Sequence, residues 1–299
     1  MQYDEVREQL KSVVVTNVTP FREDGSVDYD SAARQATFMV DNGISVVVPN
    51  GNTGEFTSLS LDEAKRMTSA VADAVGDRAL VIAGVGWSSP IAVELAQQAQ
   101  EAGAHGVMVH HPVHTYINRD ALRRYYEIIA DAIDIGVVLY KRGEELTDAL
   151  IADLAERDQV VGVKYASPDP NAFTTLVDSS SANVAWLCGI AERWAPYFAL
   201  GGAQGFTSGL ANFAPGKALE LFAALRAGDY STAMKIRREV YPFEALRQRK
   251  HSGNNVPAVK EAMATLGTDT GVVRDPLTSL EDDERRIVRD SLTAWGLLD

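Results

Sequence analysis

The sequence predicts a single (β/α)8 barrel, or TIM barrel, with additional C-terminal helices. Three observations predict this fold. Short apolar runs rich in β-formers recur along the chain, and most are followed by a helical pattern. Several runs are apolar at every position, as parallel strands buried on both faces are. Eight such alternations within about two hundred residues indicate a closed barrel.

The predicted strands each end at a small or polar residue. Leu80-Val81-Ile82 and Gly136-Val137-Val138-Leu139 have the uninterrupted apolar character of buried parallel strands. The eight predicted strands cover residues 12–19, 45–49, 79–83, 106–110, 136–140, 160–164, 185–188 and 205–208.

The predicted helices have matching start and stop signals. Ser60-Leu61-Asp62-Glu63 is a capping-box pattern, and Gly43 follows a helix as a C-terminal stop. Helices between strands are expected at 28–42, 61–75, 92–102, 119–132 and 147–157, and after the last strand at 215–227, 230–248, 256–266 and 280–295. No linker separates them, so we expect one domain over 1–299, with the barrel at about 12–225 and the helical extension at about 226–299.

Composition excludes several classes of partner. The formal charge of −13 argues against nucleic acid, whose phosphates it would repel. No stretch approaches the apolar length of a membrane span, and residues 1–5 lack the basic start of a signal peptide. The lone Cys188 cannot form an intrachain disulfide and suits a reducing compartment. We therefore expect a cytoplasmic protein that binds neither nucleic acid nor membrane.

Lys164 is the first candidate for chemistry, because it ends an apolar strand. In such barrels the active site lies at the C-terminal ends of the strands. Burial disfavours the ammonium and can lower a lysine pKa from about 10.4 toward ~7–8, which frees the amine to attack a carbonyl. The alternative is a lysine that reaches solvent or pairs with a carboxylate.

Tyr140 ends the preceding strand and is expected at the same mouth of the barrel. A phenol beside a nucleophilic amine can move the proton that carbinolamine formation and dehydration require. Alternatively, Tyr140 is an aromatic cap on the core.

Gly51-Asn52-Thr53-Gly54-Glu55 follows the second predicted strand. Its glycines allow a tight turn that presents N–H groups to an anion, and Thr53 adds a hydroxyl donor. The anion would be the carboxylate of a 2-oxo acid, although a simple strand-to-helix turn uses similar residues.

Taken together, these segments resemble the dihydrodipicolinate synthase/N-acetylneuraminate lyase family along nearly the whole chain. The order and spacing of six segments support the resemblance: Thr16–Phe21, Gly51–Glu55, Tyr140, Gly162–Lys164, Asn212–Pro215 and Asn254–Lys260.

The resemblance implies a class I aldolase-type lyase. Lys164 would form a Schiff base, Tyr140 would shuttle protons, and Thr53 with the turn's N–H groups would hold the substrate carboxylate. No metal or cofactor is implied, because the protonated imine is the electron sink. The resemblance also implies a homotetramer or homodimer. The expected substrate-binding residues are Asn52, Thr53, Gly54, Arg142, Gly189 and Thr207.

Three departures from the synthase pattern bear on the substrate. Asn52 replaces the first threonine of the turn, so the hydroxyl relay of the synthase is in doubt. The inter-subunit tyrosine pair falls on Val113 and His114, although Tyr116 lies close by. The arginine that binds the second substrate falls on Glu145, whose charge is wrong. These departures disfavour 4-hydroxy-tetrahydrodipicolinate synthase, which condenses pyruvate with aspartate semialdehyde, and it stays as the alternative.

Two segments look closer to the ketodeoxyglucarate dehydratase branch. They are Gly54–Leu59 and Tyr140-Lys141-Arg142. Arg142 could bind the distal carboxylate of a sugar diacid in a bidentate pair, or be a solvated loop charge. The sequence thus predicts a dehydratase or aldolase of a 2-keto-3-deoxy sugar acid, similar to 5-dehydro-4-deoxyglucarate dehydratase.

Two hypotheses from other classes remain. His110-His111-Pro112-Val113-His114 could bind zinc in a metal-dependent barrel enzyme. However, adjacent residues of a strand point to opposite faces. The chain could also be a non-enzymatic sensor of a 2-oxo acid, although simple binding requires neither Lys164 nor Tyr140.

Overall fold

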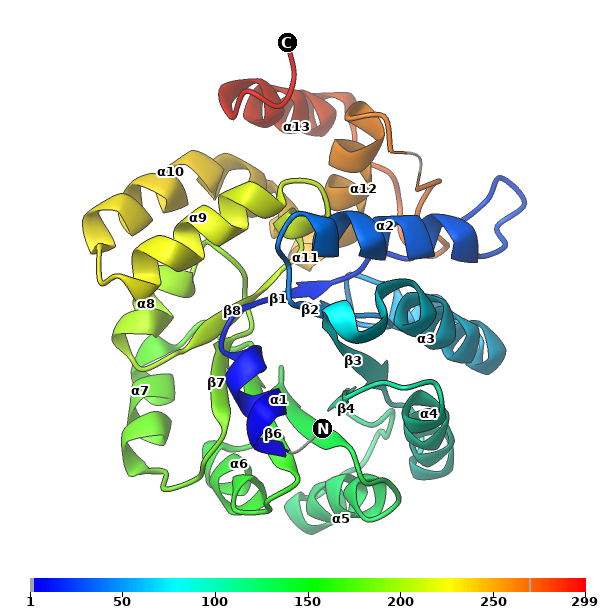
Figure 1. Ribbon diagram of the computed structural model, residues 1–299, viewed down its shortest axis with the longest axis vertical. Coiled ribbons are helices and arrows are strands. Elements are labelled where there is room, and N and C mark those ends of the chain that lie inside the picture. Colours follow the sequence, from blue (N-terminus) through cyan, green and yellow to red (C-terminus); the bar gives the residue numbers. More distant parts are fainter. Residues whose placement is uncertain (1–2, 269) are drawn as a thin grey trace.

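The computed structural model describes residues 3–268 and 270–299. Eight parallel strands close into a barrel in sequence order, and β1 pairs with both β2 and β8 (Figure 1). This confirms the predicted fold class. The strands are β1 (Val13–Thr16), β2 (Val46–Val48), β3 (Leu80–Val85), β4 (Gly106–Val109), β5 (Gly136–Lys141), β6 (Val160–Tyr165), β7 (Ala185–Cys188) and β8 (Gly205–Ser208).

Helices surround the barrel on the outside (Figure 1). Ser60 and Glu63 form the predicted capping box, and Gly43 has a positive φ of 91° after its helix. The helices are α2 (Tyr29–Asp41), α3 (Leu61–Val75), α4 (Ser89–Glu101), α5 (Arg119–Ala130), α6 (Asp148–Ala155), α7 (Pro170–Ser179), α8 (Ala195–Leu200) and α9 (Pro215–Arg226), with the short 3-10 helices η1 (Phe56–Ser58), η2 (Gly76–Arg78) and η3 (Leu210–Asn212). The sequence analysis did not predict α7 or α8.

Helix α1 (Tyr3–Leu10), which the sequence analysis also missed, crosses one end of the barrel (Figure 1). Val6 and Leu10 are buried and belong to the same apolar cluster as the side chains inside the barrel, among them Val14 and Val138. Because α1 covers this end, access to the interior is from the opposite end, where the strands terminate.

The C-terminal extension consists of α10 (Tyr230–Arg247), α11 (Arg249–Ser252), α12 (Asn255–Thr265) and α13 (Asp282–Ala294). Lys250, His251 and Ser252 all have positive φ, so the backbone leaves the right-handed helical conformation between α10 and α12. Helices α9 and α10 pack on each other across the predicted boundary near residue 225. The division into one domain with these limits stays a prediction.

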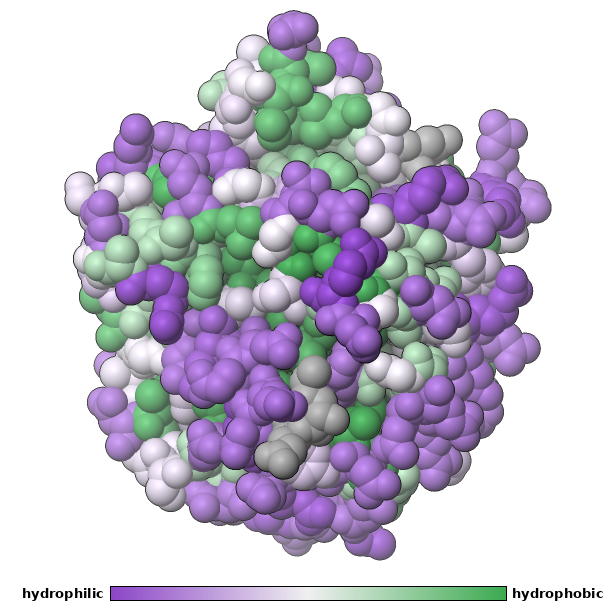
Figure 2. Space-filling model, viewed as in Figure 1, coloured by the Kyte–Doolittle hydropathy of each residue, from purple (hydrophilic) through white to green (hydrophobic). Residues whose placement is uncertain are grey.

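The face of the molecule around α1 is mostly hydrophilic (Figure 2). In the described part of the chain, no helix combines the length and the apolar character that a membrane span requires.

Candidate active site

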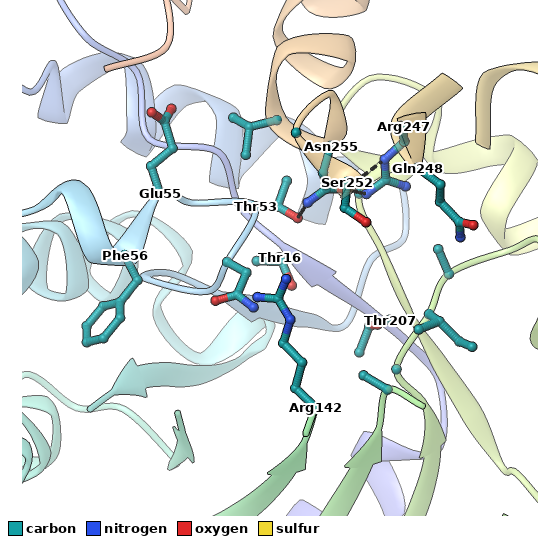
Figure 3. A pocket seen from close by; sticks show the side chains of 18 of the residues that line it. Thr16, Thr53, Glu55, Phe56, Arg142, Thr207, Arg247, Gln248, Ser252 and Asn255 are labelled. Atoms are coloured by element: carbon teal, nitrogen blue, oxygen red, sulfur yellow. Dashed lines mark hydrogen bonds between the residues drawn. The ribbon is translucent and has the colours of Figure 1, made fainter. Parts of the chain in front are cut away.

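A cavity of about 410 Å³ lies at the C-terminal ends of the strands. Barrel residues line one part of it and residues of the C-terminal extension line the other (Figure 3). The barrel residues include Thr16, Asn52, Thr53, Tyr140, Arg142, Lys164, Gly189, Thr207 and Ser208, and the extension supplies Glu244, Arg247, Gln248, Ser252 and Asn255.

An irregularity in β6 directs Lys164 into the barrel. Val137 pairs with Val160 but Val138 pairs with Gly162, so Val161 is an additional residue on β6, as in a β-bulge. Val161 belongs to the inner apolar cluster, and a Cβ on Gly162 would lie 3.2 Å from a methyl of Leu10, which also faces inward. Because Val161 and Gly162 both face inward, the inward–outward alternation of the later side chains on β6 shifts by one residue. Lys164 therefore faces inward, beside Tyr140 of β5.

The environment of Lys164 favours its neutral, nucleophilic form. The side chain is buried, and its Nζ lies 4.1 Å from the centre of the Tyr140 ring. Burial, with a smaller contribution from the charge of Arg142, lowers the pKa of Lys164 from 10.5 to about 7. No carboxylate of the described residues forms an ion pair with it. Lys164 thus fits the predicted nucleophile better than the alternative of a paired or solvated lysine.

Tyr140 is also buried, and its hydroxyl oxygen accepts a hydrogen bond of 2.8 Å from Nδ2 of Asn52. Burial raises the pKa of Tyr140, and both Arg142 and the Asn52 bond oppose that rise. The phenol thus keeps its proton at neutral pH and has its oxygen oriented by Asn52. At this position of the turn the structure thus has an amide that donates to the phenol, and no hydroxyl group.

The turn of residues 51–55 leaves two amide groups for an anion. The N–H groups of Gly54 and Glu55 donate to carbonyl oxygens within the turn, at 2.9 and 3.1 Å. The amides of Gly51, Asn52 and Thr53 have no such bond among the described residues, and Gly51 does not line the cavity, which leaves Asn52 and Thr53. Both residues line the cavity, and Thr53 adds its hydroxyl. The predicted anion site thus narrows to these two residues.

Gly54 supports this turn from behind and does not line the cavity. Its carbonyl oxygen accepts a 2.6 Å hydrogen bond from the hydroxyl of Thr19, at the exit of β1. A Cβ on Gly54 would lie 2.7 Å from the carbonyl oxygen of Asn17, so the position requires glycine. Gly189 and Thr207 do line the cavity, at the ends of β7 and β8. The N–H of Gly189 donates to Tyr165 at 2.7 Å and is not available to a ligand.

Arg142 follows β5 and extends into the cavity (Figure 3). Among the described residues no carboxylate pairs with its guanidinium. Glu145, three residues on, is exposed and does not line the cavity. Arg142 is therefore a cation available to an anionic group of a ligand.

The extension contributes a buried polar wall to the cavity, and none of its residues was a candidate from the sequence. Glu244 accepts a 2.7 Å bond from Arg247, and Nε and Nη2 of Arg247 donate to Oδ1 of Asn255 at 3.1 and 2.7 Å. A Cβ on Gly209 would lie 2.3 Å from Arg247 Nη2, so glycine at the end of β8 admits this side chain. No sequence signal places α10 over the barrel mouth, because the contact joins residues far apart in the chain.

A further buried carboxyl group, Glu192, lies behind this wall. Ser208, which lines the cavity, donates its hydroxyl to Glu192. Burial, and after it the nearby Glu244, raises the pKa of Glu192 well above its usual range, which favours the protonated carboxyl group.

The structure gives the candidate zinc ligands other surroundings. His110 stacks on Phe56 with ring centres 4.4 Å apart, its Nε2 lies 2.9 Å from the carbonyl oxygen of Asn50, and burial lowers its pKa to about 4. Within residues 3–268 and 270–299, no three side chains of His, Cys, Asp or Glu gather as metal ligands do. His114 and Tyr116 lie on an exposed loop outside this cavity, and Tyr116 is 89% exposed. A role for either in a partner subunit's site stays a prediction.

Comparisons with known proteins agree with this architecture. The model of the dihydrodipicolinate synthetase family matches residues 9–295. The chain is 34% identical to a 4-hydroxy-tetrahydrodipicolinate synthase of Moorella thermoacetica, over 97% of this chain and 100% of that protein. It is 36% identical to an uncharacterised DapA-like lyase of Halobacterium salinarum, over 97% of this chain and 95% of that protein. The crystal structure of dihydrodipicolinate synthase from Oceanobacillus iheyensis superimposes with a TM-score of 0.96 at 40% identity, over 99% of both chains.

These relatives are named as synthases or as a DapA-like lyase, and the expected ketodeoxyglucarate dehydratase branch stays a prediction. The matches cover the barrel together with the C-terminal extension, so the whole chain follows one family pattern. The chain therefore belongs to the dihydrodipicolinate synthetase family and is a lyase of that family.

Proposed function

We propose that the protein is a Schiff-base lyase acting on a 2-oxo acid, with Lys164 as the nucleophile. The observation that supports this best is the buried Lys164 amine, which has a pKa of about 7 and lies 4.1 Å from the ring centre of Tyr140. The neutral amine attacks the C2 carbonyl carbon, and Tyr140 donates a proton to the hydroxyl group that leaves as water. The protonated imine then accepts the electron pair of the bond that breaks at C3.

The substrate carboxylate binds to the amides of Asn52 and Thr53 and to the Thr53 hydroxyl. This orientation directs C2 toward Lys164, because all three donors and the amine line one cavity. Arg142 binds a second anionic group at the remote end of the substrate. Aspartate semialdehyde and a 2-keto-3-deoxy sugar diacid both have such a carboxylate.

Two reactions follow from this chemistry. The relatives named 4-hydroxy-tetrahydrodipicolinate synthase favour condensation of pyruvate with aspartate semialdehyde. Glu145, which stands at the position of the synthase arginine and is exposed outside the cavity, supports the sugar-acid dehydratase or aldolase. We therefore propose the synthase reaction as the first to assay and the sugar-acid reaction as the second.

Borohydride trapping tests the proposal. The protein is incubated with pyruvate, aspartate semialdehyde plus pyruvate, or a panel of 2-keto-3-deoxy sugar acids, then reduced and mapped by peptide mass. We expect a stable adduct on the peptide containing Lys164 and none in Lys164→Met. Activity that a chelator abolishes, without an adduct, would instead support the metal-dependent hypothesis, and pyruvate binding without turnover of any compound would support the sensor. Cytoplasmic location and a homotetrameric or homodimeric state are part of the same proposal.

A further inference from the structure

Helix α12 of the C-terminal extension contacts the turn of residues 51–55 at two points. Lys260 Nζ lies 2.7 Å from Oε1 of Glu55, the last residue of the turn, and both side chains are enclosed, with 4% and 0% of their surface exposed. Asn255, at the start of the same helix, places its Nδ2 3.4 Å from the Thr53 hydroxyl (Figure 3). One helix therefore contacts both Thr53, which receives the substrate carboxylate, and Glu55, on which the turn ends.

Glu55 is held in a conformation that a free turn would not keep. Its φ is 55° and its ψ is 35°, in the left-handed region that disfavours residues other than glycine. Its Oε2 accepts the backbone N–H of Arg274 at 2.9 Å, and Lys260 holds the other oxygen. These contacts come from the extension, so the extension stabilises the left-handed residue on which the turn ends.

Lys260 has no contact that would give it a role in binding the substrate. It does not line the cavity; its Nζ donates to the carbonyl oxygen of Val272 at 3.0 Å and lies 4.3 Å from the centre of the Phe21 ring. A buried ion pair is weak support for stability by itself, because desolvation offsets the attraction, but losing one partner leaves the other charge uncompensated. The position of Glu55 thus depends on Lys260.

We propose that Lys260 and Asn255 are positioning residues, which hold Asn52 and Thr53 in the geometry that binds the carboxylate of the 2-oxo acid. This inference rests on the proposed function. It gives the C-terminal extension a part in substrate recognition, and it gives a role to the segment Asn254–Lys260, whose resemblance to the family had no assigned purpose.

The test separates binding of the carboxylate from reactivity of the amine. Lys260→Met is compared with wild type in borohydride trapping by pyruvate and by acetone, a ketone that has no carboxylate. We expect the half-saturating pyruvate concentration to rise tenfold or more in the variant, with a smaller change in the rate at saturation. The rate with acetone should change less than twofold, since acetone has no carboxylate for the turn to bind. Glu55→Gln combined with Lys260→Met leaves no unpaired charge and should bind pyruvate about as weakly as Lys260→Met, because the contact that holds the turn is still missing.

Lys217→Met is the matched control, because it removes an ion pair of the same 2.7 Å length, with Glu239, on α9 and α10. Lys217→Met should leave trapping by pyruvate and trapping by acetone unchanged. If Lys260→Met does not fold, as judged by near-UV circular dichroism, Asn255→Leu is used instead. It should also weaken trapping by pyruvate more than trapping by acetone, with a smaller rise in the half-saturating pyruvate concentration. Equal changes for pyruvate and acetone, or no change for either, would overturn the inference. Failure of the wild type to trap either ketone at Lys164 would overturn the proposed function instead.

Discussion

Replacing Arg142 by methionine should move the pH at which Lys164 becomes nucleophilic to a higher value. The pKa of Lys164 is lowered from 10.5 to about 7, first by burial and second by Arg142. At about 1.4 kcal/mol per pKa unit, this shift represents about 5 kcal/mol in favour of the neutral amine. About half of the Lys164 side chains are then neutral at pH 7, against roughly one in 3,000 for an unshifted lysine. Removing the charge removes the smaller cause, so the pKa should rise but stay below 10.5.

The assay is the initial rate of pyruvate imine formation, trapped by borohydride at saturating pyruvate, between pH 5.5 and 9.5. Pyruvate has no second carboxylate, so the loss of Arg142 should affect the amine and leave substrate binding intact. In the wild type the rate should rise tenfold per pH unit up to about 7 and then level off. Arg142→Lys, which keeps the charge, should retain the wild-type midpoint. The reasoning fails if the wild-type midpoint lies near 10.5, or if Arg142→Met leaves it in place.

Four further substitutions test other parts of the site. Tyr140→Phe should slow imine formation at saturation by 10² to 10⁴, the usual contribution of a proton-transfer group, and an unchanged rate in stopped flow would exclude the shuttle. Asn52→Leu removes the donor to the Tyr140 oxygen and should raise the pKa of Tyr140 further, as measured by ultraviolet difference titration against Tyr140→Phe. Lys164→Met should raise the free energy of unfolding in urea by up to about 4 kcal/mol at pH 7. This gain should shrink as pH rises from about 7 toward 10.5, because there the unfolded wild type binds more protons than the folded protein; a gain that grows with pH would contradict the buried amine. Gly209→Ala should displace Arg247, which donates to Asn255, and should raise KM for an extended substrate more than it raises the half-saturating pyruvate concentration; equal loss of both would point to general disruption.

The barrel could be predicted from the sequence because its signals are local. Buried parallel strands are apolar at nearly every position, and the capping box at Ser60 and Glu63 lies within four residues. Two of the three helices that were missed lack such signals, whereas α7 begins with an Asp169 N-cap followed by Pro170. Helix α8 has only six residues, and α1 is amphipathic but precedes the first strand, where a barrel needs no helix.

Within the site, the sequence identified Lys164 and Tyr140 but could not predict how the strand alternates. From the inward Val161, strict alternation would turn Val163 inward and Lys164 outward, and the extra residue on β6 reverses this. An irregularity of one residue depends on pairing with β5, which no local pattern reveals.

The polar wall was missed for a different reason. Arg247 reaches the cavity only because α10 folds over the barrel mouth and because Gly209 leaves space for its guanidinium. Contacts between segments so distant in sequence depend on tertiary packing, so neither residue appeared as a candidate from its own surroundings. Glu145 is exposed and does not line the cavity, whereas Arg142, which the sequence offered either as a ligand for a remote carboxylate or as a solvated loop charge, does line it.

The contact of α12 with the 51–55 turn has a consequence for the order in which the site matures during translation. Lys164, Tyr140 and the turn are all made before α10–α12, and domains generally begin to form while synthesis continues. A nascent barrel can therefore bury its reactive amine before Lys260 has formed its ion pair with Glu55. We expect that such a chain already reacts with simple ketones and gains its preference for acids only when the last helices dock.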